Sequence, residues 1–264
     1  MGKNLLTKED LLSQLQKFKH AVGKIVIVHT SIKAVGKIDG GGETLLSALI
    51  DFFTQDEGLL CVPTHTWDSD VYDLRKAESC IGVLPCLAAA HPKAVRTLHP
   101  THSMAVFGNR EKIEEFIKNE QVVDTPTNPR GCYGKIFDED GYVLLIGVGH
   151  EKNTFIHCAE EMLGMPGRHM DYKSEKTIIH RDGTEEKRFL YLLDEEIIDV
   201  SLNFPKFEEP FRYYGCIEDG FIGNAKTQLC SARKMYEVME KIYKNNCFGE
   251  LLYDDLPIDK KLYV

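Results

Sequence analysis

The chain has 264 residues, of which 43% are hydrophobic, and carries a formal net charge of -9 at pH 7. This length and composition suffice for a sizeable core, and we expect one domain over residues 1–264. The excess of 41 Asp and Glu over 32 Lys and Arg argues against nucleic acid or an anionic membrane as a partner. It favours a cationic small molecule instead.

The chain lacks the sequence signals of a membrane or secreted protein. No stretch approaches the roughly 20 consecutive apolar residues of a membrane span. The polar segment 1–10 has no apolar core of a secretory signal. Eight cysteines without such a signal favour reduced thiols, and no two of them form the Cys-x-x-Cys pair of a zinc ribbon. We therefore expect a cytoplasmic protein.

The first third of the chain has the pattern of a parallel α/β sheet. Apolar spacing predicts helices over 7–18 and 43–53, and continuous apolar runs predict buried strands over 25–28 and 58–62. In such sheets ligands bind beyond the carboxyl ends of the strands. Polar side chains follow both strands at that edge: His29, Thr30 and Ser31 after the first, and Thr64, His65 and Thr66 after the second.

The rest of the chain adds shorter elements and an antiparallel part. In chain order we expect helix 85–90, extended segment 95–97, strand 104–107, helix 110–119, helix 133–137, strand 142–148, a hairpin of strands 177–180 and 188–193, helix 204–212, extended segment 220–225 and helix 227–243. The predicted fold is α/β, with a central mixed, largely parallel sheet flanked by helices and with antiparallel additions in the C-terminal half.

The stretch Asn153–Glu161 is the strongest candidate for the chemistry. It follows the most convincing strand and predicts a short helix, with Asn153 or Thr154 as its N-cap. On a helix, Glu160 and Glu161 lie three and four residues beyond His157, so a carboxylate can lie beside the imidazole. A general base with an orienting partner needs this arrangement. A surface histidine beside a solvated glutamate has the same spacing.

Other motifs support weaker hypotheses. The loop Gly40–Gly42 is equally consistent with a phosphate cradle and with a flexible turn, because it matches neither Gly-x-Gly-x-x-Gly nor a Walker A loop. The imidazoles of His65, His99 and His102 suggest a metal, but no carboxylate stands at ligand spacing and we expect none to bind. A Cys–His hydrolase that uses one of the eight cysteines remains open.

Five motifs occur in one order along most of the chain. They are His29-Thr30-Ser31 with Gly36 and Gly41-Gly42 downstream, Pro63-Thr64-His65-Thr66, the segment from Arg96 to Ser103, the segment from Asn153 to Glu160, and Gly220 to Ala225. In this order they resemble the aminoglycoside N(3)-acetyltransferase family, also called the antibiotic N-acetyltransferases. Each motif is weak alone, and the ordered set is specific.

The resemblance implies acetyl transfer from acetyl-coenzyme A to the 3-amino group of a 2-deoxystreptamine antibiotic, without a metal. It implies that His157 is the general base and that Glu160 orients it or helps to hold the ammonium group. Coenzyme A and a cationic amine would be the partners, and a homodimer is one assembly that it allows. The coenzyme-binding residues that it implies are His29, Thr30 and Ser31, with Arg96, His99 and Ser103 lining the thioester end.

Physical chemistry agrees with the implied reaction. An amine is mostly protonated at neutral pH and must lose a proton before it attacks a thioester, and a neutral imidazole held by a carboxylate can take that proton. Hydroxyl or N–H donors, such as those of Thr30 or Ser31, would stabilise the oxyanion. Two segments, 130–136 and 203–209, depart from the family pattern. They leave the reaction class standing and leave open a different amine as acceptor. A non-catalytic coenzyme A-binding protein is a further alternative, against which the His157–Glu160 pair argues.

Overall fold

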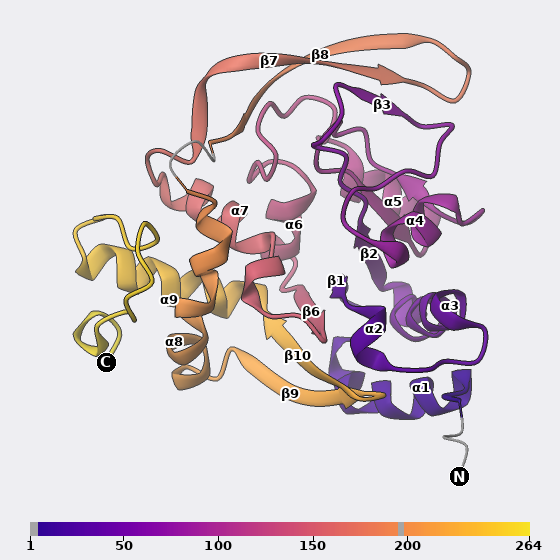
Figure 1. Cartoon of the computed structure of the whole chain (residues 1–264), viewed down its shortest axis with the longest axis horizontal. Coiled ribbons are helices and arrows are strands. Elements are labelled where there is room, and N and C mark those ends of the chain that lie inside the picture. Colours follow the sequence, from indigo (N-terminus) through magenta and orange to yellow (C-terminus); the bar gives the residue numbers. More distant parts are fainter. Residues whose placement is uncertain (1–4, 195–197) are drawn as a thin grey trace.

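The computed structural model describes residues 5–194 and 198–264. Within these residues the centre of the fold is a seven-stranded sheet with the strand order β4-β5-β2-β1-β6-β10-β9 (Figure 1). Its strands are β1 (Ile25–Thr30), β2 (Leu59–Pro63), β4 (Val95–Arg96), β5 (Met104–Phe107), β6 (Tyr142–Ile146), β9 (Ile217–Ile222) and β10 (Ala225–Ser231).

The predicted fold class, a mixed α/β sheet flanked by helices, is confirmed. Strand β1 pairs in parallel with β2 and with β6, whereas β5, β4, β10 and β9 join in antiparallel pairings. The sheet is therefore parallel only at its centre, and antiparallel strands stand on both sides rather than only in the C-terminal half. On the β4 side the reason is the connection, because the short loop 97–103 between β4 and β5 has no room for the crossover that parallel neighbours need.

Helices cover both faces of this sheet because its strands alternate their side chains. In β1, Ile25 and Ile27 enter one core cluster, and Val26 and Val28 enter the other. The cluster of Val26 and Val28 packs under α1 (Lys8–Leu15), α3 (Gly41–Phe53) and α4 (Val83–Ala90). The cluster of Ile25 and Ile27 packs under α5 (Arg110–Ile117), α6 (Cys132–Asp138), α7 (Phe155–Leu163), α8 (Glu208–Tyr213) and α9 (Ala232–Asn245).

A smaller three-stranded sheet lies beyond one end of the central sheet (Figure 1). Its strands are β3 (Val71–Asp73), β7 (His169–Ile179) and β8 (Glu185–Leu193). The predicted hairpin of 177–180 and 188–193 is confirmed, and it is longer than expected. Strand β3 pairs in parallel with β7, an association that the sequence pattern did not indicate.

The terminal helix begins later than expected. Residues 227–231 belong to β10, which pairs antiparallel with β6, and α9 starts at Ala232 with the Ser231 hydroxyl accepting from the Lys234 amide. The apolar residues in 227–231 are also compatible with helical spacing. They form a strand because their backbone can hydrogen-bond to the edge of β6. No helix in the described ranges is both long enough and apolar enough to cross a membrane.

Candidate active site

A cavity of about 410 Å³ opens at the carboxyl edge of the central sheet. Strands β1, β2 and β6 are parallel neighbours, so the segments that follow them meet at one place. The cavity is lined by His29 and Thr30 from the end of β1, by His65 and Trp67 beyond β2, and by Asn153, Thr154 and His157 beyond β6. The sheet topology thus brings together motifs that are far apart in the sequence.

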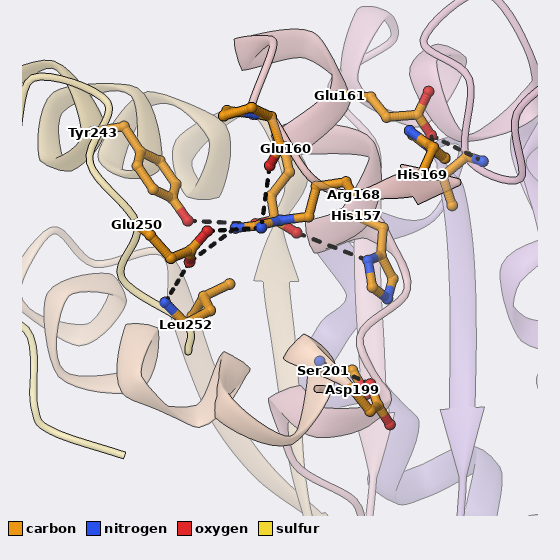
Figure 2. Close-up of polar contacts among 12 residues, drawn as sticks. His157, Glu160, Glu161, Arg168, His169, Asp199, Ser201, Tyr243, Glu250 and Leu252 are labelled. Atoms are coloured by element: carbon orange, nitrogen blue, oxygen red, sulfur yellow. Dashed lines mark hydrogen bonds and ion pairs between the residues drawn. The ribbon is translucent and has the colours of Figure 1, made fainter. Parts of the chain in front are cut away.

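Helix α7 places His157 at the cavity and Glu160 behind it. Phe155, Ile156 and Cys158 are buried and fix the helix, whereas His157 lines the cavity. The Nδ1 atom of His157 lies 3.8 Å from Oε2 of Glu160, across one helical turn (Figure 2). Both atoms are buried, and neither has a hydrogen-bond partner in the part of the chain that the structure describes. Each is therefore free to interact with the other. The distance is longer than a hydrogen bond, so the two groups interact as neighbours without a direct hydrogen bond.

Burial sets the charge of both groups. It lowers the pKa of His157 to about 4, against the opposing effect of the Asp199 charge. Burial also raises the pKa of Glu160 to about 7, and the neighbouring Arg168 guanidinium limits the rise. At neutral pH the imidazole is therefore uncharged, and the Glu160 carboxylate is harder to ionise than an exposed one. A general base needs an unprotonated imidazole of this kind.

Glu161 has a different role from Glu160. Its carboxylate accepts hydrogen bonds from the Thr125 hydroxyl at 2.7 Å and from the Thr127 hydroxyl at 2.6 Å, and it lies 3.2 Å from Nε2 of His169. These contacts fasten the irregular segment 124–131 to α7. The Glu161 carboxylate therefore holds this loop, and Glu160 is the carboxylate that lies beside His157.

The end of β1 presents unpartnered polar atoms to the cavity. His29 Nε2 and Thr30 Oγ1 are buried and have no hydrogen-bond partner among the residues that the structure describes. Burial, with the charge of Lys152, lowers the pKa of His29 to about 3, so this imidazole is neutral too. Ser31 caps the short helix α2 (Ile32–Val35) through a bond from the Ala34 amide and is not among the described lining residues.

Three of the residues expected at the thioester end lie away from the cavity lining. The Arg96 guanidinium donates to the Lys76 carbonyl at 2.8 Å and stacks over the Tyr72 ring. His99 accepts from the His102 amide and lies 3.1 Å from the Thr125 carbonyl, and the Ser103 hydroxyl donates to the Thr64 carbonyl. Their polar groups are thus engaged by neighbouring backbone: Arg96 holds the segment around Lys76, His99 holds its own loop, and Ser103 ties that loop to the end of β2. From this loop Thr101 and His102 line the cavity.

One wall of the cavity is made of rings. The rings of His65 and His102 pack at a tilt of 41° with centroids 4.3 Å apart, and the Trp67 ring centroid lies 4.9 Å from that of His65. The His65 Nε2 atom is 3.0 Å from the Tyr133 hydroxyl. Burial holds the pKa of both imidazoles well below its usual range. Across residues 5–194 and 198–264, no group of three or more His, Cys, Asp or Glu side chains is arranged to hold a metal ion.

The glycine loop before α3 serves packing in this fold. Gly42 packs against the side-chain tips of Ile32 and Leu87, and a side-chain carbon there would lie 2.8 Å from both tips, which would have to move. Gly40 and Gly41 have positive φ angles at the start of the helix. None of the three glycines is among the described residues that line the cavity.

Two side chains beside His157 were missed by the sequence analysis. Phe204 packs edge-on against the imidazole with ring centroids 4.8 Å apart. Asp199 also lines the cavity, on the same side as His157 (Figure 2). Asp199 caps the helical turn Val200–Phe207 by accepting from the Ser201 amide at 3.0 Å. An aspartate ahead of a helical turn is an ordinary capping signal. Only the fold shows that this cap also faces His157.

Comparison with known proteins gives a consistent result. The model of the family described as aminoglycoside 3-N-acetyltransferase matches residues 27–244. Aminoglycoside N(3)-acetyltransferase VII of Streptomyces paromomycinus is 28% identical over 88% of this chain and 89% of its own length. The SPbeta prophage-derived aminoglycoside N(3')-acetyltransferase-like protein YokD of Bacillus subtilis (strain 168) is 23% identical over 91% and 93%.

Solved structures share the fold. AAC-IIIb in a binary complex with coenzyme A superposes with a TM-score of 0.79 at 21% identity, covering 94% of this chain and 99% of that one. A histidine-to-alanine mutant of AAC(3)-IVa in complex with a gentamicin gives a TM-score of 0.78 at 23% identity, covering 94% and 92%.

Together the fold, the cavity at the carboxyl edge of the parallel strands and the ordered motifs define an acyltransferase. The family model covers most of the chain, and the chain belongs to the aminoglycoside 3-N-acetyltransferase family.

Proposed function

We propose that this protein transfers the acetyl group of acetyl-coenzyme A to an amine, with His157 as the general base. The observation that carries the proposal is a neutral imidazole at the cavity whose buried Nδ1 atom faces Glu160, which leaves Nε2 for the substrate. The reaction as proposed uses no metal ion.

The end of β1 is suited to the cosubstrate. Acetyl-coenzyme A supplies an acetyl group activated as a thioester. The unpartnered Thr30 hydroxyl can donate a hydrogen bond to the thioester oxygen, where negative charge develops during attack. Neutral His29 adds a second polar atom, and Lys152 adds a positive charge at the same cavity. We propose that His29, Thr30 and Ser31 form the coenzyme end of the site, with Ser31 acting through the cap of α2.

His157 handles the proton during transfer. Its Nε2 atom takes a proton from the acceptor amine as the amine nitrogen bonds to the acetyl carbon and the carbon–sulfur bond breaks. The imidazolium that forms is stabilised by ionised Glu160 and by Asp199. The proton then passes to the thiolate of coenzyme A. The Phe204 ring, packed against the imidazole, keeps this side of the site apolar.

The first candidate for the acceptor is the 3-amino group of a 2-deoxystreptamine aminoglycoside, supported by the family and by the net charge of -9. Glu151 and Asp199 are the carboxylates among the described lining residues, and they would hold ammonium groups.

A different amine is the second candidate. The described lining combines those two carboxylates with Lys152 and with a wall of His65, His102 and Trp67. Such a site offers little negative charge for a polycation and much ring surface for a less charged amine. A cysteine-dependent hydrolase is not supported, because no described lining residue is a cysteine and burial raises the pKa of the Cys158 thiol well above its usual value.

Replacement of His157 tests the mechanism. The variant His157→Ala should lose about 100-fold or more in kcat, since general base catalysis contributes roughly 10²–10⁴-fold. Release of coenzyme A thiol with a 2-deoxystreptamine antibiotic as acceptor measures it. The control His180→Ala removes an imidazole from the β7–β8 hairpin, where its partner is Glu186, and should keep wild-type turnover. Wild-type turnover by His157→Ala would overturn the proposal.

A panel of acceptors separates the two candidate amines. With acetyl-coenzyme A fixed, aminoglycosides are compared with aromatic and aliphatic monoamines by kcat/KM. Selective turnover of the 2-deoxystreptamine compounds supports the first candidate, and selective turnover of the monoamines supports the second.

A further inference from the structure

A buried arginine connects the His157–Glu160 pair to the C-terminal segment, residues 246–264. The Arg168 Nε atom donates to Glu160 Oε1 at 2.7 Å, and its two terminal nitrogens donate to the Glu250 carboxylate at 2.8 and 3.1 Å (Figure 2). The Arg168 side chain is 3% exposed and that of Glu160 is 0% exposed. All three nitrogens of this guanidinium group therefore donate to one of the two carboxylates, and one of them also donates to the Pro166 carbonyl.

The two oxygens of Glu160 have separate partners. Oε1 accepts from Arg168 and, at 3.4 Å, from the Tyr243 hydroxyl of α9. Oε2 accepts from nothing among the described residues and faces His157 Nδ1. Because Arg168 and Tyr243 hold one oxygen, the carboxylate plane is fixed and the other oxygen is directed at the imidazole.

Glu250 fixes Arg168 from the far side. Its Oε1 atom also accepts from the backbone amides of Leu251 and Leu252, which locks the carboxylate in place. Glu250 lies after residue 244, where the match to the family model ends. This chain therefore completes the support of its catalytic pair with a residue outside the matched region.

The charges in this network oppose one another. The groups that face Glu160 are His157 on its own helix, Arg168 before β7, Tyr243 on α9 and Glu250 on the C-terminal segment. Burial raises the pKa of Glu160, Arg168 and Tyr243 lower it, and the Glu250 charge raises it. Two carboxylates thus share one guanidinium group, and Glu250 holds Arg168 while disfavouring the ionised form of Glu160.

We propose that Arg168 and Glu250 are positioning residues for the catalytic base: Arg168 directs Glu160 at His157, and Glu250 anchors Arg168. This inference rests on the proposed role of His157. It assigns the C-terminal segment a part in catalysis through contacts that do not reach the cavity.

The pH dependence of turnover tests the inference. Glu250→Gln keeps the shape and an acceptor oxygen but removes the charge, so Glu160 ionises more readily. The acid limb of kcat, measured at saturating substrates, should move to lower pH. Arg168→Lys keeps a charge but loses the forked geometry, so the limb should move to higher pH and kcat below pH 7 should fall about tenfold. A purely structural role would not give opposite shifts.

Two controls sharpen the result. Asp254→Asn removes a carboxylate of the same segment that pairs with Lys206, and it should leave the acid limb in place. In a Glu160→Gln background, Glu250→Gln should cause no shift, because the effect passes through Glu160. An equal shift in that background would overturn the inference, as would an unmoved limb in Glu250→Gln.

An NMR titration of the His157 imidazole separates this inference from the proposed function. Glu250→Gln should change the apparent pKa of His157 whether or not His157 is the base, and an unchanged titration would overturn the link. Wild-type turnover by His157→Ala would instead refute only the catalytic role. If Arg168→Lys does not fold, Glu250→Gln alone still tests the inference. Glu250 lies partly at the surface, so we expect that variant to fold.

Discussion

At the scale of single residues, burial decides the protonation states of the side chains in the site. His157 is neutral because it is buried, and Glu160 is difficult to ionise for the same reason. Asp199 opposes the effect on His157, since a nearby negative charge favours the imidazolium. In the proposed mechanism the Asp199 carboxylate thus stabilises protonated His157 and is also suited to hold a positively charged acceptor beside it.

We predict that Asp199→Asn weakens amine binding more than it slows chemistry. Asparagine is as good an N-cap as aspartate, so the turn Val200–Phe207 should stay folded. The loss of one charge-assisted hydrogen bond, about 1.5–3 kcal/mol, should raise the KM for the amine by roughly ten- to a hundredfold. Steady-state kinetics with the amine varied measure it, and an unchanged KM would exclude Asp199 from the acceptor site.

At the scale of elements, short helices position the cavity walls through close backbone contacts. In α6, Gly134 packs directly on the Pro129 backbone, where a side-chain carbon would lie 1.7 Å from the Pro129 carbonyl oxygen. This contact places the neighbouring Tyr133 hydroxyl against His65. The irregular segment 124–131 is thus held by α6 from one side and by Glu161 of α7 from the other.

We predict that Gly134→Ala destabilises the protein by about 2 kcal/mol or more, because an extra methyl group in a packed contact forces the backbone to move. Chemical denaturation at pH 7 measures the free energy of unfolding. Gly149→Ala is the matched control: its new carbon would meet only the flexible side chain of Glu151, and it should cost little. Equal stability of the two variants would contradict the packing argument.

At the scale of the whole molecule, the sheet gathers neutral imidazoles from distant parts of the chain. Burial lowers the pKa of all of the following: His29, His65, His99, His102, His150 and His157. In the unfolded chain these groups take up protons below about pH 6.5. In the folded protein, His29, His99, His150 and His157 stay neutral until the pH falls to about 3–4.

That the chain forms a single domain stays a prediction.

We predict that stability falls steeply as the pH drops from 7 to 5. In this range the unfolded state binds more protons than the folded state, so the free energy of unfolding decreases with falling pH. Each such histidine contributes about 1.4 kcal/mol per pH unit below its unfolded pKa, so the total loss should reach several kcal/mol. Denaturant midpoints at pH 7, 6 and 5 measure it. A flat profile would mean that these imidazoles are not neutral in the folded protein.

The sequence by itself determined the local elements, the fold class and the His157–Glu160 pair. Continuous apolar runs identified β1, β2 and β6, and the i, i+3 spacing placed a carboxylate beside the imidazole because a helix has one geometry. The ordered motifs identified the family. These features depend only on neighbours within a few residues or on the order of residues along the chain. They can therefore be predicted before the fold is known.

The tertiary structure decided which polar groups reach the cavity. Arg96, His99 and Ser103 have side chains suited to a ligand, but in the fold these groups bond to nearby backbone of the Lys76 segment, of their own loop and of the end of β2. Asp199 and Phe204 have no distinguishing local signal, and Glu250 lies far beyond Glu160 in the sequence. Contacts of this kind depend on the packing of distant segments, whose free energies are not encoded in local spacing, and only the folded chain brings them together.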